Sequence, residues 1–205
     1  MGMLQHTLGI LVSPRSEWKL IRSEKRPFLQ VFIGQVPFLA LIPSISAYIG
    51  VTQVGWSVGE GDPIKLTAAS AASLCALAYV VLLVGIYVLG EFINWMSKTY
   101  GVQGDEATRR YGATALAVYV STPVLIAGVA NLYPEMWFVI AIMGLAGTYA
   151  VFLIYQGIPI VMNISKEQAF MYANSVVTVA LVLMVTVLMA TVVIWGLGVG
   201  PVYVD

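Results

Sequence analysis

The chain has 205 residues, 60% of them hydrophobic and only 10% charged, and its ten Lys and Arg residues balance its ten Asp and Glu residues. Soluble domains have about 45–50% apolar and about 25% charged residues, so this chain has too little charge for a soluble surface. Disordered chains are poor in apolar residues, and nucleic-acid-binding domains carry a basic excess, so the composition also excludes these two classes.

Residues 1–27 are predicted to form a cytoplasmic segment that contains a short interfacial helix. Ser13 and Pro14 are typical of a helix start, because serine can cap the first turn and proline has no N–H to leave unpaired. A basic helix with an aromatic residue tends to lie among lipid headgroups, and this one is expected to contact the membrane or a partner. A helix that only flanks the first span is the alternative. The residues predicted to make the contact are Arg15, Trp18, Lys19 and Arg22.

Residues 28–205 are predicted to form a bundle of five transmembrane helices. A spanning helix needs about 20 mostly apolar residues, and five stretches qualify, at about residues 28–50, 66–93, 112–132, 136–162 and 173–200. They are continuously apolar rather than alternating in polarity, which excludes the strands of a β-barrel. The predicted fold is therefore an all-α integral membrane protein. Four prolines inside these spans are predicted to kink their helices: Pro37, Pro43, Pro123 and Pro159.

Lys and Arg are distributed asymmetrically among the segments that connect the spans. The N-terminal segment has five, the second loop three and the fourth loop one, whereas the opposite side has only Lys65. Short cytoplasmic loops carry the excess of basic residues, so this split of nine against one predicts a cytoplasmic N-terminus and an external C-terminus. No Lys or Arg precedes residue 15, which is the wrong order for a signal peptide, and we expect the first span to be retained.

Glu91 is the only ionisable side chain in a predicted span, which makes it a candidate functional residue. Tyr87, Glu91 and Asn94 share a helix face near the end of the second span. One interpretation pairs Glu91 at the cytoplasmic interface with Lys98 or with Arg109 and Arg110. The other places it in a path for ions or protons. The run of small residues from 68 to 73 in the same span favours close helix packing, with contact to a second copy as the alternative.

Tyr149 and Gln156 lie seven residues apart in the fourth span and therefore share a face. Proline-interrupted helices frame cavities in transporters, so this face is a second candidate for lining a path. Kinks that only shape the bundle are the alternative interpretation.

No set of residues with catalytic or metal-binding spacing is found. The chain has one histidine, His6, in a segment expected to be frayed, and one cysteine, Cys75, in an apolar run. Asp105 and Glu106 are adjacent and would point in different directions on a helix, which argues against a shared metal. We therefore predict no cofactor, no metal and no enzymatic activity.

A series of short motifs runs along most of the chain: Ser13-Pro14 and Trp18, Tyr119-Val-Ser-Thr-Pro123, Pro134, Gly147-Thr-Tyr149, Leu153-Ile-Tyr155-Gln-Gly157-Ile-Pro159, Met162, Lys166-Glu167-Gln-Ala169 and Tyr172. In the order and spacing of these motifs the chain resembles the Yip1 family, membrane proteins with five spanning helices, and in particular its prokaryotic members.

The resemblance implies a fold and topology more directly than a molecular function. Eukaryotic members are implicated in vesicle traffic and contact small GTPases. They also have a longer cytosolic N-terminus with an acidic-aromatic motif before the first span, which this chain lacks. The predicted function is that of a non-enzymatic protein of the prokaryotic plasma membrane, which acts through lipid or protein contacts in membrane organisation or trafficking-like roles. The alternative is a small transporter or channel component with a path near Glu91. The expected partners are the lipid bilayer and a membrane protein or second copy, with no nucleic acid.

Overall fold

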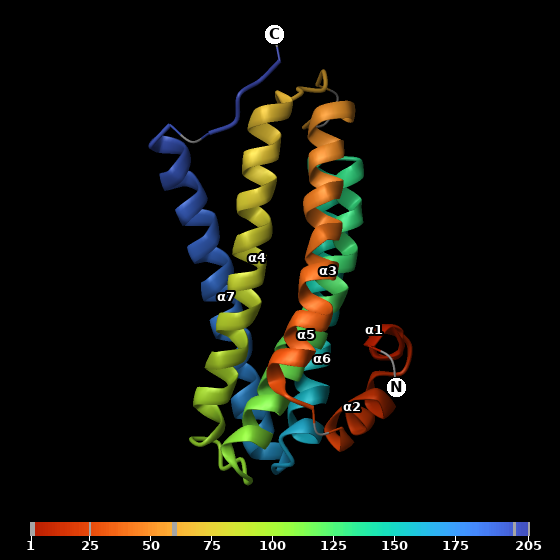
Figure 1. Cartoon of the computed structure of the whole chain (residues 1–205), viewed down its shortest axis with the longest axis vertical. Coiled ribbons are helices and arrows are strands. Elements are labelled where there is room, and N and C mark those ends of the chain that lie inside the picture. The colour runs from red at the N-terminus through yellow and green to blue at the C-terminus, as the bar shows by residue number, and fades with distance from the viewer. Residues whose placement is uncertain (1–2, 25, 59–60, 199, 205) are drawn as a thin grey trace.

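The computed structural model describes residues 3–24, 26–58, 61–198 and 200–204. Over these ranges the chain forms seven α-helices, arranged as an upright bundle with two short helices against one end (Figure 1). The helices are α1 (Met3–Val12), α2 (Pro14–Ser23), α3 (Phe28–Ile49), α4 (Ala68–Ser97), α5 (Glu106–Ala127), α6 (Met136–Val161) and α7 (Lys166–Gly196). A π-helical turn, Gly50–Val54, extends α3, and a 3₁₀ turn, Gly128–Leu132, extends α5.

Five of these helices are long and apolar enough to cross a membrane, which confirms the predicted all-α fold class. With their extensions they run from 26 residues in α6 to 31 residues in α7. At 1.5 Å per residue each exceeds about 30 Å, the thickness of the hydrocarbon layer. The division into a cytoplasmic segment and a membrane domain stays a prediction.

Two of the long helices, α5 and α7, begin outside the predicted apolar stretches, because polar residues cap their first turns. Asp105 accepts a hydrogen bond from Thr108 N at 3.2 Å and starts α5, and Ser165 Oγ accepts one from Gln168 N at 3.2 Å and starts α7. Glu135 caps α6 in the same way, with 2.6 Å from Phe138 N to its carboxylate. Such caps satisfy N–H groups that have no partner inside the helix. α5 and α7 therefore begin six and seven residues before the predicted spans.

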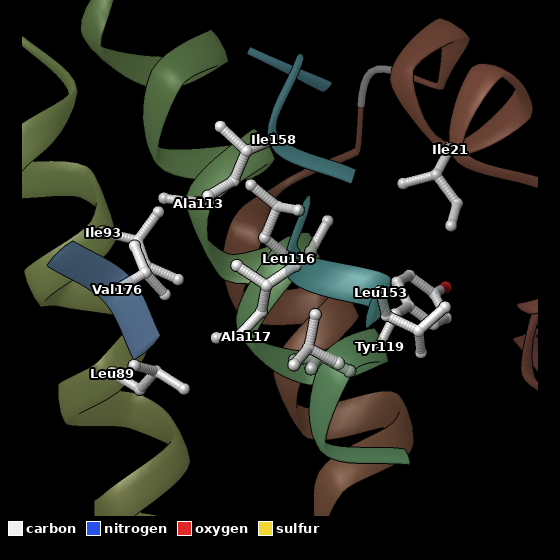
Figure 2. Close-up of a cluster of buried hydrophobic side chains, with 14 of the residues drawn as sticks. Ile21, Leu89, Ile93, Ala113, Leu116, Ala117, Tyr119, Leu153, Ile158 and Val176 are labelled. Atoms are coloured by element: carbon white, nitrogen blue, oxygen red, sulfur yellow. The ribbon is translucent and has the colours of Figure 1, made fainter. Parts of the chain in front are cut away.

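α5 is the central helix of the bundle. In its most apolar stretch 72% of the residues are buried, against 28% or less in each of the other four long helices. Figure 2 shows Leu116 and Ala117 of α5 on the side of Ile93 of α4 and Val176 of α7, with Leu153 of α6 beside Tyr119. Many of the buried residues of α5 are small, and small residues let helix backbones approach closely where lipid supplies no hydrophobic drive.

The predicted prolines lie inside α3, α5 and α6, and each of these helices continues past them. Pro43 of α3 packs against Gly128, where an added Cβ would lie 2.4 Å from the Pro43 Cβ. At this point a proline and a glycine allow the end of α5 to approach α3. The prediction that the four prolines kink their helices is not decided by these contacts.

The N-terminal segment contains more structure than the sequence suggested. α2 begins at Pro14 as predicted, but the Ser13 side chain makes no capping hydrogen bond. The expectation of a frayed N-terminus is wrong for the described residues, because α1 precedes α2 and is packed against the bundle. Tyr149 of α6 fixes α1 in place, since its hydroxyl donates to the carbonyl oxygens of Ile10 and Leu11 at 3.2 and 3.0 Å.

Candidate functional site

Trp18 attaches α2 to the bundle. Its side chain is 0% exposed and packs where α6 carries Gly157. A Cβ added at Gly157 would lie 2.7 Å from Trp18 Cε2 and 2.8 Å from Leu116 Cδ2, so only glycine leaves room for the indole. The Tyr119 ring meets the indole edge-on, with centroids 6.3 Å apart. Trp18 therefore faces the protein interior, and an outward contact of α2 falls to its other predicted residues.

The outward face of α2 is basic. Arg15, Lys19 and Arg22 are all exposed, and their spacing of four and three residues places them on one side of the helix. Among the described residues no carboxylate forms an ion pair with any of the three. The buried face holds Ile21, whose carbonyl accepts a hydrogen bond from the Tyr111 hydroxyl at 2.8 Å. The helix thus presents free cations from a firmly held position.

Two open grooves meet beside this basic face. The first, of about 820 Å³, lies between α2 and α6 and is lined by Arg15, Lys19 and Gln156, with Phe152 and Leu20 as its apolar wall. The second, of about 440 Å³, lies between α6 and the start of α7. It shares Arg15 and Gln156 with the first and adds Lys166, Tyr155 and Phe170. Among the described residues, no acidic side chain lines either groove. The arrangement suits an anion bound next to an apolar surface.

Gln156 has no hydrogen-bond partner within the described part of the chain. Its Oε1 is buried and unpaired, and no hydrogen bond of the described residues uses its Nε2. The sequence placed Gln156 and Tyr149 on a path-lining face. In the structure Tyr149 holds α1, whereas Gln156 opens into the grooves beside Arg15. Two residues assigned to different hypotheses, Arg15 and Gln156, are therefore neighbours.

Glu91 is paired with Arg110 of α5. The guanidinium Nη2 and Nε donate to Glu91 Oε1 at 2.6 and 3.1 Å, and the guanidinium carbon lies 4.0 Å from the centre of the Phe28 ring. Both side chains are about one-third exposed, at 35% for Glu91 and 31% for Arg110. Of the basic partners expected for Glu91, the structure selects Arg110. Tyr87 packs its ring edge-on against Phe32 on the same side of α4.

The structure does not join the two groups of the predicted path. Glu91 and Tyr87 face α3 and α5, whereas Tyr149 and Gln156 face α1 and α2. Asn94 is half-buried, and its carbonyl accepts a hydrogen bond from Ser97 Oγ at 2.6 Å. Among the described residues no hydrogen bond or ion pair links one group to the other.

A buried charged cluster at the α1–α2 junction was missed from the sequence. His6 is 0% exposed; its Nδ1 meets the Glu17 carboxylate, and its Nε2 lies 3.0 Å from Glu24 Oε1. Arg26 pairs with Glu24, with 3.1 Å between Arg26 Nε and Glu24 Oε2. The sequence feature that could have indicated this cluster is the pair Glu17 and Glu24, two acids seven residues apart in an otherwise basic segment. The contacts themselves, across 11 and 18 residues, have no local signature.

The remaining titratable groups do not build a metal site. No cluster of three or more His, Cys, Asp or Glu side chains with metal-binding geometry occurs within the ranges that the structure describes. Asp105 is engaged as a helix cap, and the hydrogen bonds from the Thr108 side chain and backbone lower the pKa of its carboxyl.

The five long apolar helices and the buried central helix define a polytopic membrane protein of the cell membrane. The Yip1 domain family model matches residues 8–198, and the chain belongs to this family. It is 32% identical over 195 residues to the inner membrane protein YohC of Escherichia coli K12, which covers 95% of this chain and 98% of YohC. The YohC protein of the O6:H1 strain CFT073 is similar to the same degree. No solved structure matches.

Proposed function

We propose that this protein is a non-enzymatic organiser of the prokaryotic plasma membrane, which acts through contacts between its cytoplasmic face and lipids or a membrane protein. The observation that carries the proposal is the position of α2. Trp18 packs against Gly157, and Arg15, Lys19 and Arg22 are exposed and form no ion pair with any described residue. Unpaired cations on a firmly held helix near the membrane surface attract anionic lipids or an acidic partner surface.

A transport path near Glu91 has less support. Arg110 neutralises Glu91 at a partly exposed position, which matches a structural ion pair better than a membrane-centre carboxylate that exchanges protons. A path through the centre of the bundle would have to run along α5. The side chains of α5 are buried, apolar or small along most of the helix and pack against the neighbouring helices.

Catalysis has less support still. His6 would be the natural general base, but both of its ring nitrogens face carboxylate oxygens in the buried cluster. It has no free nitrogen to accept a proton from a substrate. The names of the similar proteins give a membrane location and mention no catalytic activity.

The proposal is tested by cross-linking in cells combined with a flux assay. Reversing the charge at Arg15, Lys19 and Arg22 together is expected to change which lipids or proteins are cross-linked at α2, because attraction becomes repulsion. Lys98→Glu, another exposed cation on the same predicted side, serves as the matched control and is expected to leave the pattern unchanged.

The flux assay uses the purified protein in liposomes, with protons, common cations and small solutes. We expect no flux above empty liposomes. A flux that Glu91→Gln abolishes, with the fold intact, would contradict the proposal and establish the transporter alternative.

A further inference from the structure

We infer that the two grooves around Arg15 form one binding site for the phosphate of an anionic phospholipid. This inference rests on the proposed function and deepens it, because it names the ligand class and the residues that bind it. It also brings in Gln156 and Lys166, which lie on α6 and α7 rather than on the basic helix.

The first argument is the concentration of unpaired positive charge. Arg15 lines both grooves, with Lys19 in one and Lys166 in the other, and within the described residues none of the three has an acidic partner. Arginine matches a phosphate with two parallel N–H donors, and lysine adds a point charge, so the set is suited to one phosphate group.

The second argument is the start of α2. The helix begins in the first groove at Pro14, and its N-cap residue Ser13 makes no side-chain hydrogen bond to the first turn. The N-terminal end of a helix carries partial positive charge and unpaired N–H groups, which favour an anion. The helix end and the side-chain cations therefore act on the same space.

The third argument is the Gln156 amide. Its Oε1 is buried without a hydrogen-bond partner in the described part of the chain, at the point where the two grooves meet. A buried polar group left unpaired destabilises the protein. A phosphate oxygen in the grooves can accept a hydrogen bond from Nε2 of the same amide.

The fourth argument separates a lipid from a free phosphate ion. The walls of the grooves are apolar and exposed, with Phe152 and Leu20 in the first and Phe170 in the second. A free phosphate ion makes no favourable contact with these apolar surfaces, whereas the acyl chain of a phospholipid would cover them. The grooves lie at the end of the bundle that the positive-inside rule assigns to the cytoplasmic side. At this end the helices leave the hydrocarbon layer and meet the lipid headgroups.

The experiment measures lipid binding to the delipidated full-length protein in detergent by native mass spectrometry. The probes are phosphatidylglycerol, phosphatidylcholine and inorganic phosphate as competitor. We expect phosphatidylglycerol to bind more tightly than phosphatidylcholine. Arg15→Gln and Lys166→Gln should each weaken phosphatidylglycerol about tenfold, the effect of losing one charge-assisted contact. Lys98→Gln, an exposed cation away from both grooves, should change nothing.

Three results would overturn the inference. Equal affinity for the two lipids would remove the phosphate-charge argument, and unchanged affinity in both variants would place the lipid elsewhere. Displacement of phosphatidylglycerol by inorganic phosphate at equal concentration would show that the ligand is a free anion. Thermal unfolding of each variant checks the fold, and Lys19→Gln is a second variant in the first groove.

The outcome is separable from that of the proposed function. If the variants bind lipid normally while charge reversal on α2 still alters cross-linking, the lipid site is wrong and the proposed function stands. If Glu91-dependent flux is found, the proposed function fails whatever the lipid affinities are.

Discussion

α5 and α7 are both long apolar helices, yet they occupy opposite environments. In the most apolar stretch of α5, 72% of the residues are buried, whereas in that of α7 none are. The amino-acid types differ accordingly: α5 carries Gly112, Ala113, Ala115 and Ala117 where neighbouring helices approach, and α7 carries Leu, Val and Met along exposed positions. Apolar character thus places a helix in the membrane, and side-chain size decides whether it lies at the centre of the bundle or at its lipid-facing edge.

The test with the largest expected effect replaces one tryptophan packed against the central helix and one tryptophan of α7. Trp18→Ala removes a fully buried indole packed against α5 and α6, and we expect it to lower the free energy of unfolding by about 3–5 kcal/mol, as for large core truncations. Trp195→Ala in α7 removes an indole that is 46% exposed and should have a much smaller effect. Thermal unfolding in detergent measures both. Equal losses would show that α7 is as tightly packed as the centre.

The second test enlarges one alanine in each helix. Ala117 of α5 is 1% exposed and lies against Gly90 of α4, where an added Cβ would be 3.5 Å from the Ala117 Cβ. Ala117→Leu should therefore destabilise by about 1–3 kcal/mol through overpacking. Ala190→Leu in α7, at an exposed position, should be close to neutral. The same unfolding assay decides, and a neutral Ala117→Leu would contradict close packing between α4 and α5.

A smaller effect is expected from the ion pair that joins α4 to α5. Glu91→Gln removes the charge that Arg110 contacts at 2.6 Å. Because both side chains are partly exposed, we expect a loss of about 1 kcal/mol or less in unfolding free energy. Glu167→Gln at the exposed start of α7 is the control. A loss of several kcal/mol would mean that the pair is effectively buried in the membrane.

The smallest effect concerns how the two helices begin. α5 is capped by the carboxylate of Asp105 and α7 by the hydroxyl of Ser165, so of these two capping groups only that of α5 is a carboxyl group. Hydrogen bonds from Thr108 lower the pKa of Asp105 in the folded protein. Its contribution to stability is present above the unfolded-state pKa and is lost as the pH falls through the folded value.

Asp105→Asn keeps a capping side chain without the titration. The variant should therefore show a slightly shallower loss of Tm than the wild-type chain between neutral and acidic pH. Identical pH profiles for the two proteins would assign the acid sensitivity to other carboxylates.

Much of the fold follows from local sequence. The five long helices were predictable because an apolar run of sufficient length has to satisfy its backbone hydrogen bonds internally when it is in lipid. The start of α2 at Pro14 followed from local chemistry as well, since proline suits the first helical position. What local patterns missed is α1, because its packing depends on Tyr149, 138 residues away from Leu11.

The candidate site shows the same division more sharply. The sequence by itself determined that Arg15, Lys19 and Arg22 belong to a basic helix that begins at Pro14, because helix starts and helical periodicity are local properties. Only the tertiary structure decided that Trp18 faces Gly157, that Glu91 selects Arg110, and that Gln156 and Lys166 lie beside Arg15. These pairings join different helices. They are decided by which side chains fit between packed backbones, and that fit is a property of the assembled bundle rather than of any one segment.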